Sequence, residues 1–169
     1  GKINGCFVIG VAGSDEKCRY IVDELGFDAA INYKTQNVSE ELAQLSPTGV
    51  DCYFDNVGGS ITDAVFDNLA LKSRVAICGQ ISQYNAAEPQ LGPRNLSVLT
   101  RMRGTVEGFL VYDFELQHEI ARARIAGWIK DGRIKYKEDV VDGFENAPEA
   151  FIGLLTGKNF GKLLVKVSE

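Results

Sequence analysis

Residues able to bind a ligand gather where the expected strands of this sequence end. The stretch Val50–Gly59 begins with a mainly apolar and aromatic run that does not alternate, which is typical of a strand covered on both faces. It ends at Asp55-Asn56, and Gly58-Gly59 then turn into a helix. Because open α/β sheets bind ligands outside the carboxyl ends of their strands, Asn56 is expected at a ligand. The alternative is that Asn56 only tolerates an unusual turn conformation.

The same strand-turn-helix pattern recurs along most of the chain. Further strands are expected at 6–12, 29–33, 74–79 and 104–111, and helices at 14–25, 39–45, 60–71, 96–101 and 116–129. Alternation of strands and helices with short connections predicts an α/β fold with a doubly wound parallel sheet. Residues 80–94 lack periodicity, and a long loop at the carboxyl end of a strand is usually functional.

The pattern changes after Arg133, where polar extended residues precede one more helix and a half-exposed strand at 162–167. We therefore predict an incomplete nucleotide-binding domain at 1–134 and, at 135–169, a return segment of a second domain. No G-x-G-x-x-G turn follows any expected strand, so the first βα unit of a dinucleotide fold is expected just before Gly1.

Composition narrows the function classes. The net charge of −5 comes without a basic patch, which argues against nucleic-acid binding. No apolar run approaches the length of a membrane span. The four cysteines form no C-x-x-C pair and His118 is the single histidine, so we expect no metal site. Four reduced cysteines fit a cytoplasmic protein.

Eight short motifs occur in the order typical of one enzyme family. They are AGSDEK at 12–17, LGFD at 25–28, NYK at 32–34, YFDNVGG at 53–59, CGQISQYN at 78–85, GFLV at 108–111, ENAP at 145–148 and GKNFGK at 157–162. The sequence resembles the prostaglandin reductase and alkenal double-bond reductase branch of the zinc-free medium-chain dehydrogenases/reductases. Members of that branch are about twice as long and begin with a GroES-like catalytic domain. The resemblance implies that this chain corresponds to the C-terminal half, with 135–169 belonging to the catalytic domain.

The resemblance implies NADP(H) as the cofactor, and the residues offer a physical reason. An NAD-binding fold carries an acid near the end of its second strand, whereas here Ala12-Gly13-Ser14 leave room for a 2′-phosphate. Lys17 and the hydroxyl of Tyr33 are the expected phosphate ligands, although both fit ordinary surface or packing roles. By resemblance, the rest of the cofactor is surrounded by strand-end residues: Asn56, Cys78, Gly79, Ile81, Ser82, Tyr84, Phe109, Leu110, Val111 and Asn159.

The reaction implied by the resemblance is reduction of a carbon–carbon double bond conjugated to a carbonyl. Hydride arrives at the β-carbon, and negative charge moves to the carbonyl oxygen. A hydrogen-bond donor already placed at that oxygen usually makes the largest contribution to lowering the barrier. Tyr84 is the candidate donor, the alternative being that it only stacks in an ordered loop. Cys78 is expected to form a wall of the cofactor site, since no base is near it in sequence. His118 is expected on the solvated face of a helix.

Two alternatives to this function remain open. The same cofactor with a different acceptor would make the protein a quinone oxidoreductase. If the chain is complete, it would be a non-catalytic nucleotide-binding or dimerisation module. If it is part of a longer enzyme, the fragment alone is expected to be inactive. A homodimer joined through 105–111 is expected from the superfamily. Prostaglandin-like lipids, alkenals and plant-type enones all remain as small-molecule substrates.

Overall fold

The computed structural model describes residues 1–168. It divides into two compact units: the first unit holds residues 1–30 and 120–169, and the second unit holds residues 31–119. Helices alternate with strands along the chain, and each strand register that the structure gives is parallel. The predicted α/β class is therefore confirmed. The domain boundary near residue 134 stays a prediction.

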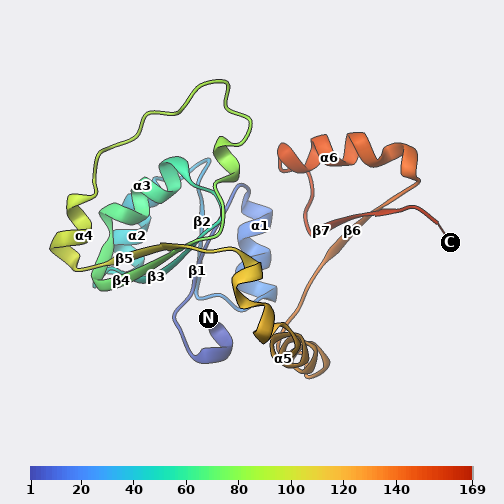
Figure 1. The fold of residues 1–169 in the computed structure, drawn as a ribbon, viewed down its shortest axis with the longest axis horizontal. Helices are drawn as coiled ribbons and strands as arrows, with labels where there is room; N and C mark the ends of the chain where they lie inside the picture. Colours follow the sequence, from blue (N-terminus) through green and yellow to red (C-terminus); the bar gives the residue numbers. More distant parts are fainter. Residues whose placement is uncertain (169) are drawn as a thin grey trace. The chain divides into compact units, whose positions relative to one another are not determined.

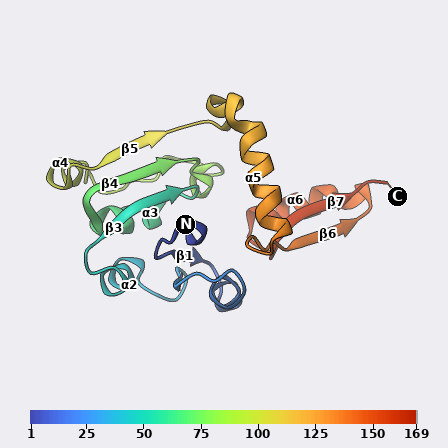
Figure 2. The ribbon, with the colours of Figure 1, turned by 90° about the horizontal axis from the view of Figure 1, so that it is seen from below.

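The second unit is built on a three-stranded sheet. Strands β3 (Val50–Asp55), β4 (Leu69–Ile77) and β5 (Thr105–Gly108) pair in that order and in parallel. The helices are α2 (Val38–Leu45), α3 (Gly59–Asp67) and α4 (Ser97–Met102). Figures 1 and 2 show α3 lying against β3 and β4, and a long loop running from the carboxyl end of β4 back to α4. All three strands thus end at one edge, which the turn after β3 and the start of this loop occupy.

The core of the second unit lies between α3 and the sheet. Ile61, Val65 and Phe66 form the inner face of α3, and they are buried together with Leu69 and Val75 of β4. The spacing of these helix residues matches one face of a helix. Burial of this face fixes where α3 begins, and so fixes the turn that precedes it.

Strand β4 begins earlier than the sequence predicts. A helix was expected to continue to residue 71, but α3 ends at Asp67 and Leu69 already pairs with Val50. The register shifts between Val50 and Cys52, whose partner is Arg74, and Lys72 inside the irregularity has a φ of 59°. Burial of Leu69 and Ala70 against α3 outweighs the helix propensity of the local Leu-Ala-Leu-Lys sequence.

Only one face of β3 is covered by residues of the second unit. Tyr53 and Asp55 point toward α3, whereas Phe54 points the other way and is 63% exposed. The expected cover on both faces is therefore not supplied within residues 31–119. The described chain forms the separate groups β1-β2 and β3-β4-β5. The doubly wound fold has the strand order 3-2-1-4-5-6. Without its first strand, this order leaves one group of two strands and one of three, as found here.

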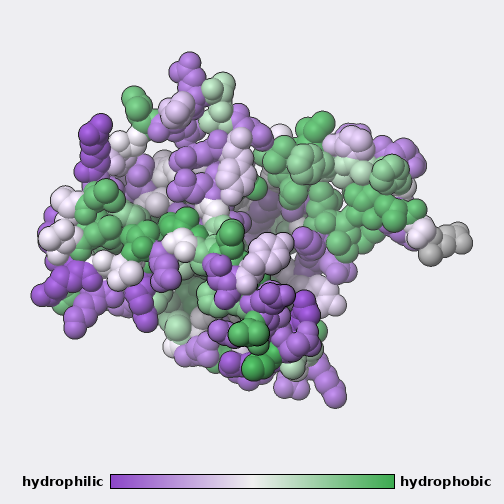
Figure 3. All heavy atoms as spheres, viewed as in Figure 1, coloured by the Kyte–Doolittle hydropathy of each residue, from purple (hydrophilic) through white to green (hydrophobic). Residues whose placement is uncertain are grey.

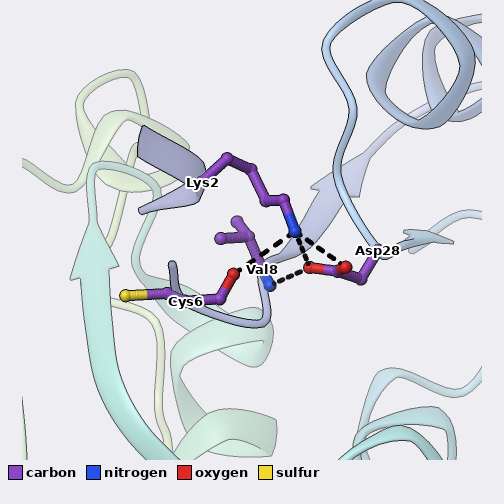
Figure 4. Close-up of polar contacts among 4 residues, drawn as sticks. All are labelled: Lys2, Cys6, Val8 and Asp28. Carbon is purple, nitrogen blue, oxygen red and sulfur yellow. Dashed lines mark hydrogen bonds and ion pairs between the residues drawn. The ribbon is translucent and has the colours of Figure 1, made fainter. Parts of the chain in front are cut away.

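The first unit begins with a short 3-10 turn at Lys2–Asn4, held by an ion pair. The Lys2 ammonium lies 2.8 Å from Asp28, which also accepts the amide hydrogen of Val8 (Figure 4). These hydrogen bonds hold the pKa of Asp28 below its ordinary value. Strand β1 (Ile9–Ala12) follows and pairs with β2 (Ala29–Asn32), which runs into the second unit. Ser14 caps the start of α1 (Asp15–Arg19), since its Oγ accepts the amide hydrogen of Lys17.

The rest of the first unit contains a helix without a buried face and a small sheet. Helix α5 (His118–Lys130) reaches into it from the second unit, and none of its residues is buried. Ile120 and Ile125, two apolar residues of this helix, are exposed. Strands β6 (Glu138–Asp142) and β7 (Lys162–Lys166) pair in parallel and flank α6 (Ala147–Leu155). Within residues 1–168, every helix is too short or too polar to traverse a lipid bilayer.

Candidate active site

The turn after β3 depends on its glycines and on one buried acid. Gly58 and Gly59 have φ values of 74° and 64°, a region that side chains disfavour. A Cβ on Gly58 would also lie 2.9 Å from Cβ of Gln80. The amides of Val57 and Gly58 both donate to Oδ1 of Asp55 at 2.9 Å. Asn56 lies at the exposed tip of this turn.

The segment after β4 is bound to that turn by a series of hydrogen bonds. Cys78 and Gly79 donate their amide hydrogens to the carbonyl of Asp55, at 2.7 and 3.2 Å. Ile81 donates to the carbonyl of Asn56 at 3.3 Å. The carbonyl of Val57 receives both the amide and the hydroxyl of Ser82, at 3.0 and 2.6 Å. The structure thus brings together six predicted site residues, Asn56, Cys78, Gly79, Ile81, Ser82 and Tyr84.

Tyr84 presents its hydroxyl beside a glycine. The side chain is 65% exposed, and its oxygen accepts the Gln80 amide hydrogen at 3.1 Å. A Cβ on Gly79 would lie 2.7 Å from this oxygen and 2.8 Å from Oδ1 of Asn56. The absence of a side chain at Gly79 therefore lets a phenol and an amide converge on one spot, as a site for a polar ligand requires.

Residues 109–111 form an exposed apolar continuation of β5. Phe109 donates its amide hydrogen to the carbonyl of Ile77 at 3.3 Å, and its ring lies 6.1 Å from Phe54. Leu110 and Val111 are exposed. The half-buried His118, expected on a solvated face, has Nε2 3.0 Å from the carbonyl of Val111.

The predicted site residues of the first unit meet at one turn, residues 157–161. Lys17 donates from Nζ to the carbonyl of Gly157 at 2.9 Å, and Asn159 donates from Nδ2 to that of Gly161 at 2.7 Å. Asp139 accepts the amide hydrogens of Phe160 and Gly161, which hold its pKa below the ordinary value. Tyr33, the other predicted phosphate ligand, belongs to the second unit and is exposed after β2.

The residue that sequence reasoning missed is Asp55, which was taken only as the end of a strand. Its side chain is 0% exposed and also accepts the hydroxyls of Tyr53 and Thr62, at 3.1 and 2.6 Å. Burial, together with the charge of Asp55, raises the pKa of Tyr53 to about 12. An acid closing an apolar strand just before Asn-Val-Gly-Gly was the available signal, since a buried carboxylate has to be satisfied by donors.

A family model described as "Zinc-binding dehydrogenase" matches residues 1–126. The chain belongs to this family. It is 45% identical to the 2-alkenal reductase (NADP(+)-dependent) of Nicotiana tabacum, with 99% of this chain and 49% of that protein covered. It is 43% identical to prostaglandin reductase 1 of Rattus norvegicus, with 98% of this chain and 50% of that protein covered.

Among solved structures, CurA of Vibrio vulnificus in complex with NADPH matches with a TM-score of 0.94 at 44% identity. That match covers 100% of this chain and 52% of the CurA chain. The chain therefore spans about half the length of the relatives it matches. The branch predicted from the eight motifs is confirmed. Among residues 1–168 there is no group of three side chains arranged to hold a metal ion.

Proposed function

We propose that the protein is an NADPH-dependent reductase acting on carbon–carbon double bonds conjugated to a carbonyl, and that this chain supplies cofactor-binding residues. The observation that carries the proposal is the convergence of Asn56, Gly79 and Tyr84 at the carboxyl ends of β3 and β4. The names of the alkenal and prostaglandin reductases, and the NADPH of the Vibrio structure, support it.

The strand-end residues suit a dinucleotide. The glycines at 58, 59 and 79 let backbone atoms approach a ligand closely, and Asn56 and Ser82 offer polar side chains there. Bound NADPH would supply the hydride that the double bond receives. In the first unit, Lys17 uses one of its three ammonium hydrogens on Gly157, which leaves two for a 2′-phosphate. Tyr33, in the second unit, stays a predicted ligand of a 2′-phosphate.

Tyr84 is proposed as the donor to the substrate's carbonyl oxygen. The Gln80 amide already donates to the phenol oxygen, which leaves the phenol's own proton for another acceptor. A hydrogen bond accepted by a hydroxyl also strengthens the one it donates. The phenol would therefore stabilise the negative charge that develops on the carbonyl oxygen during reduction.

The test is NADPH oxidation by the complete protein, given a 2-alkenal, a cyclic enone or a quinone in parallel. We expect NADPH to be consumed with the alkenal or enone, and mass spectrometry to find the saturated carbonyl product. Reduction of the quinone alone would replace the proposal with a quinone oxidoreductase. NADPH binding without turnover of any acceptor would favour a non-catalytic module. The homodimer and the cytoplasmic location stay predictions, to be measured by light scattering and by cell fractionation.

A further inference from the structure

We propose that Asp55 is a positioning residue, whose buried carboxylate holds the turn at 56–59 and through it the segment that carries Tyr84. The inference rests on the proposed function, because it assigns the placement of the same site. It concerns a residue that touches neither substrate nor cofactor.

The carboxylate of Asp55 is satisfied entirely by neutral donors. Its Oδ1 accepts from the amides of Val57 and Gly58 and from the hydroxyl of Tyr53, and its Oδ2 accepts from Thr62. Four donors therefore converge on its two oxygens. Such charge-assisted hydrogen bonds are about twice as strong as neutral ones. The orientation of the two turn amides is therefore set more firmly than the flexible residues 58 and 59 would otherwise permit.

Fixing these two amides also fixes the carbonyls on the other side of the same peptide planes. The Val57 amide shares its plane with the carbonyl of Asn56, and the Gly58 amide shares its plane with the carbonyl of Val57. Those two carbonyls are the acceptors for Ile81 and Ser82. The backbone carbonyl of Asp55 itself receives Cys78 and Gly79. The side chain of Asp55 thus orients two of the three successive carbonyls to which Cys78, Gly79, Ile81 and Ser82 donate.

Tyr84 stands at the end of this series. Residues 81–83 form a single 3-10 turn, and Tyr84 donates its amide hydrogen to the carbonyl of Ile81 at 3.4 Å. Its hydroxyl returns to the Gln80 amide. A rotation of the peptide planes at 56–58 would therefore shift both Asn56 and the phenol that share the space above Gly79.

The two oxygens of Asp55 have different partners, which allows an experiment to distinguish positioning of the turn from stabilisation of the fold. Thr62 reaches Oδ2 from α3, whereas the turn amides use Oδ1. Thr62→Val removes a helix contact and leaves the turn amides bound, which makes it the matched control for Asp55→Asn. A purely structural aspartate would lower the melting temperature in both variants while leaving the folded enzyme's kinetics unchanged.

The experiment compares the complete wild-type protein, D55N and T62V in melting temperature, NADPH Kd and kcat at saturating NADPH. We expect D55N to weaken NADPH binding about tenfold and to lower kcat about tenfold, as the loss of a charged hydrogen-bond acceptor predicts. We expect T62V to melt earlier but to keep Kd and kcat within about twofold of wild type. Wild-type Kd and kcat in folded D55N would overturn the proposal.

Amide hydrogen exchange separates this inference from the proposed function. In the wild type without NADPH, the amides of Val57, Gly58 and Ser82 are expected to be protected, and D55N is expected to release them together. Exchange of these wild-type amides as fast as those of the exposed loop 85–94 would overturn the proposal even if D55N does not fold. Protection in a protein that reduces no enone would refute the proposed function and leave the positioning role standing.

Discussion

Tyr84 and Tyr136 are equally exposed residues, yet only Tyr84 lies among the strand-end residues. Both side chains are 65% exposed. If the phenol of Tyr84 donates to the carbonyl oxygen of the substrate, Tyr84→Phe in the complete protein should lower kcat about 100-fold, the loss typical of one oxyanion donor. NADPH Kd should stay within about twofold, because the ring remains.

Tyr136→Phe is the control for this substitution, since it removes a phenol of the same exposure outside the candidate site. It should leave both kcat and Kd at wild-type values. Stopped-flow absorbance of NADPH at saturating enone measures the chemical step directly. An unchanged kcat in Tyr84→Phe would exclude the tyrosine from the reaction.

The raised pKa of Tyr53 predicts how the stability of the folded protein changes with pH. Its pKa is raised to about 12 in the folded protein, while an unfolded tyrosine titrates near 10. The folded state therefore holds the phenolic proton more tightly, so this stabilisation is complete below about pH 10 and is lost as the pH rises toward 12. Urea unfolding between pH 9 and 12 should show this loss in wild type and a shallower one in Tyr53→Phe. Equal slopes in the two proteins would contradict the raised pKa.

Two glycines in secondary-structure elements differ in their surroundings, and replacing them by alanine should change stability in opposite directions. A Cβ on Gly161 would overlap the backbone carbonyl of Lys137, where β6 and β7 begin to pair, whereas Gly127 inside α5 has nothing within 4 Å. Gly161→Ala should destabilise the protein by about 1–3 kcal/mol, because backbone atoms cannot move aside as a side chain can. Gly127→Ala should stabilise it by about 0.5–1 kcal/mol, through helix propensity. Chemical denaturation measures both, and a loss of stability in Gly127→Ala would show that α5 has a close neighbour there.

The elements also show what the sequence was able to predict. The alternation of Leu163, Val165 and Val167 with Lys162, Leu164 and Lys166 predicted one more exposed face on the last strand. Strand β7 has this pattern of exposure from Lys162 to Lys166, whereas Val167 lies beyond the strand and is exposed. Asn56 at the end of β3 was also singled out from local sequence, whereas the site residues after β4 came from the family resemblance, and their roles stay predictions. Local sequence did not predict that Leu69 and Ala70 join β4, because their pairing with Val50 and packing on α3 are tertiary interactions. Asp55 escaped notice for a related reason, since its donors come from Tyr53, the turn and α3.

For the molecule as a whole, apolar surface indicates further contacts. Phe54 on β3 and the α6 residues Phe151 and Ile152 are each more than 60% exposed. Figure 3 shows apolar side chains gathered at the surface over α6 and β7. A single exposed apolar residue is ordinary, but clusters of this kind mark surfaces that bind other protein. A strand such as β3, paired on one side within residues 1–168, adds an open edge.

The last prediction follows from these surfaces and from the match to half of each relative. Expressed alone, residues 1–169 should bind an apolar dye, aggregate and reduce no enone. The complete protein should bind little dye, form nothing larger than the expected homodimer and reduce the enone. Light scattering, dye fluorescence and NADPH oxidation on both samples, beside the intact mass of the natural protein, test this. In the complete protein a partner on the open edge of β3 would satisfy its backbone groups, and burial of Phe54 would contribute roughly 2 kcal/mol. A 169-residue natural protein that stays monomeric and reduces enones would contradict it, because the exposed edge and apolar faces would then need no cover.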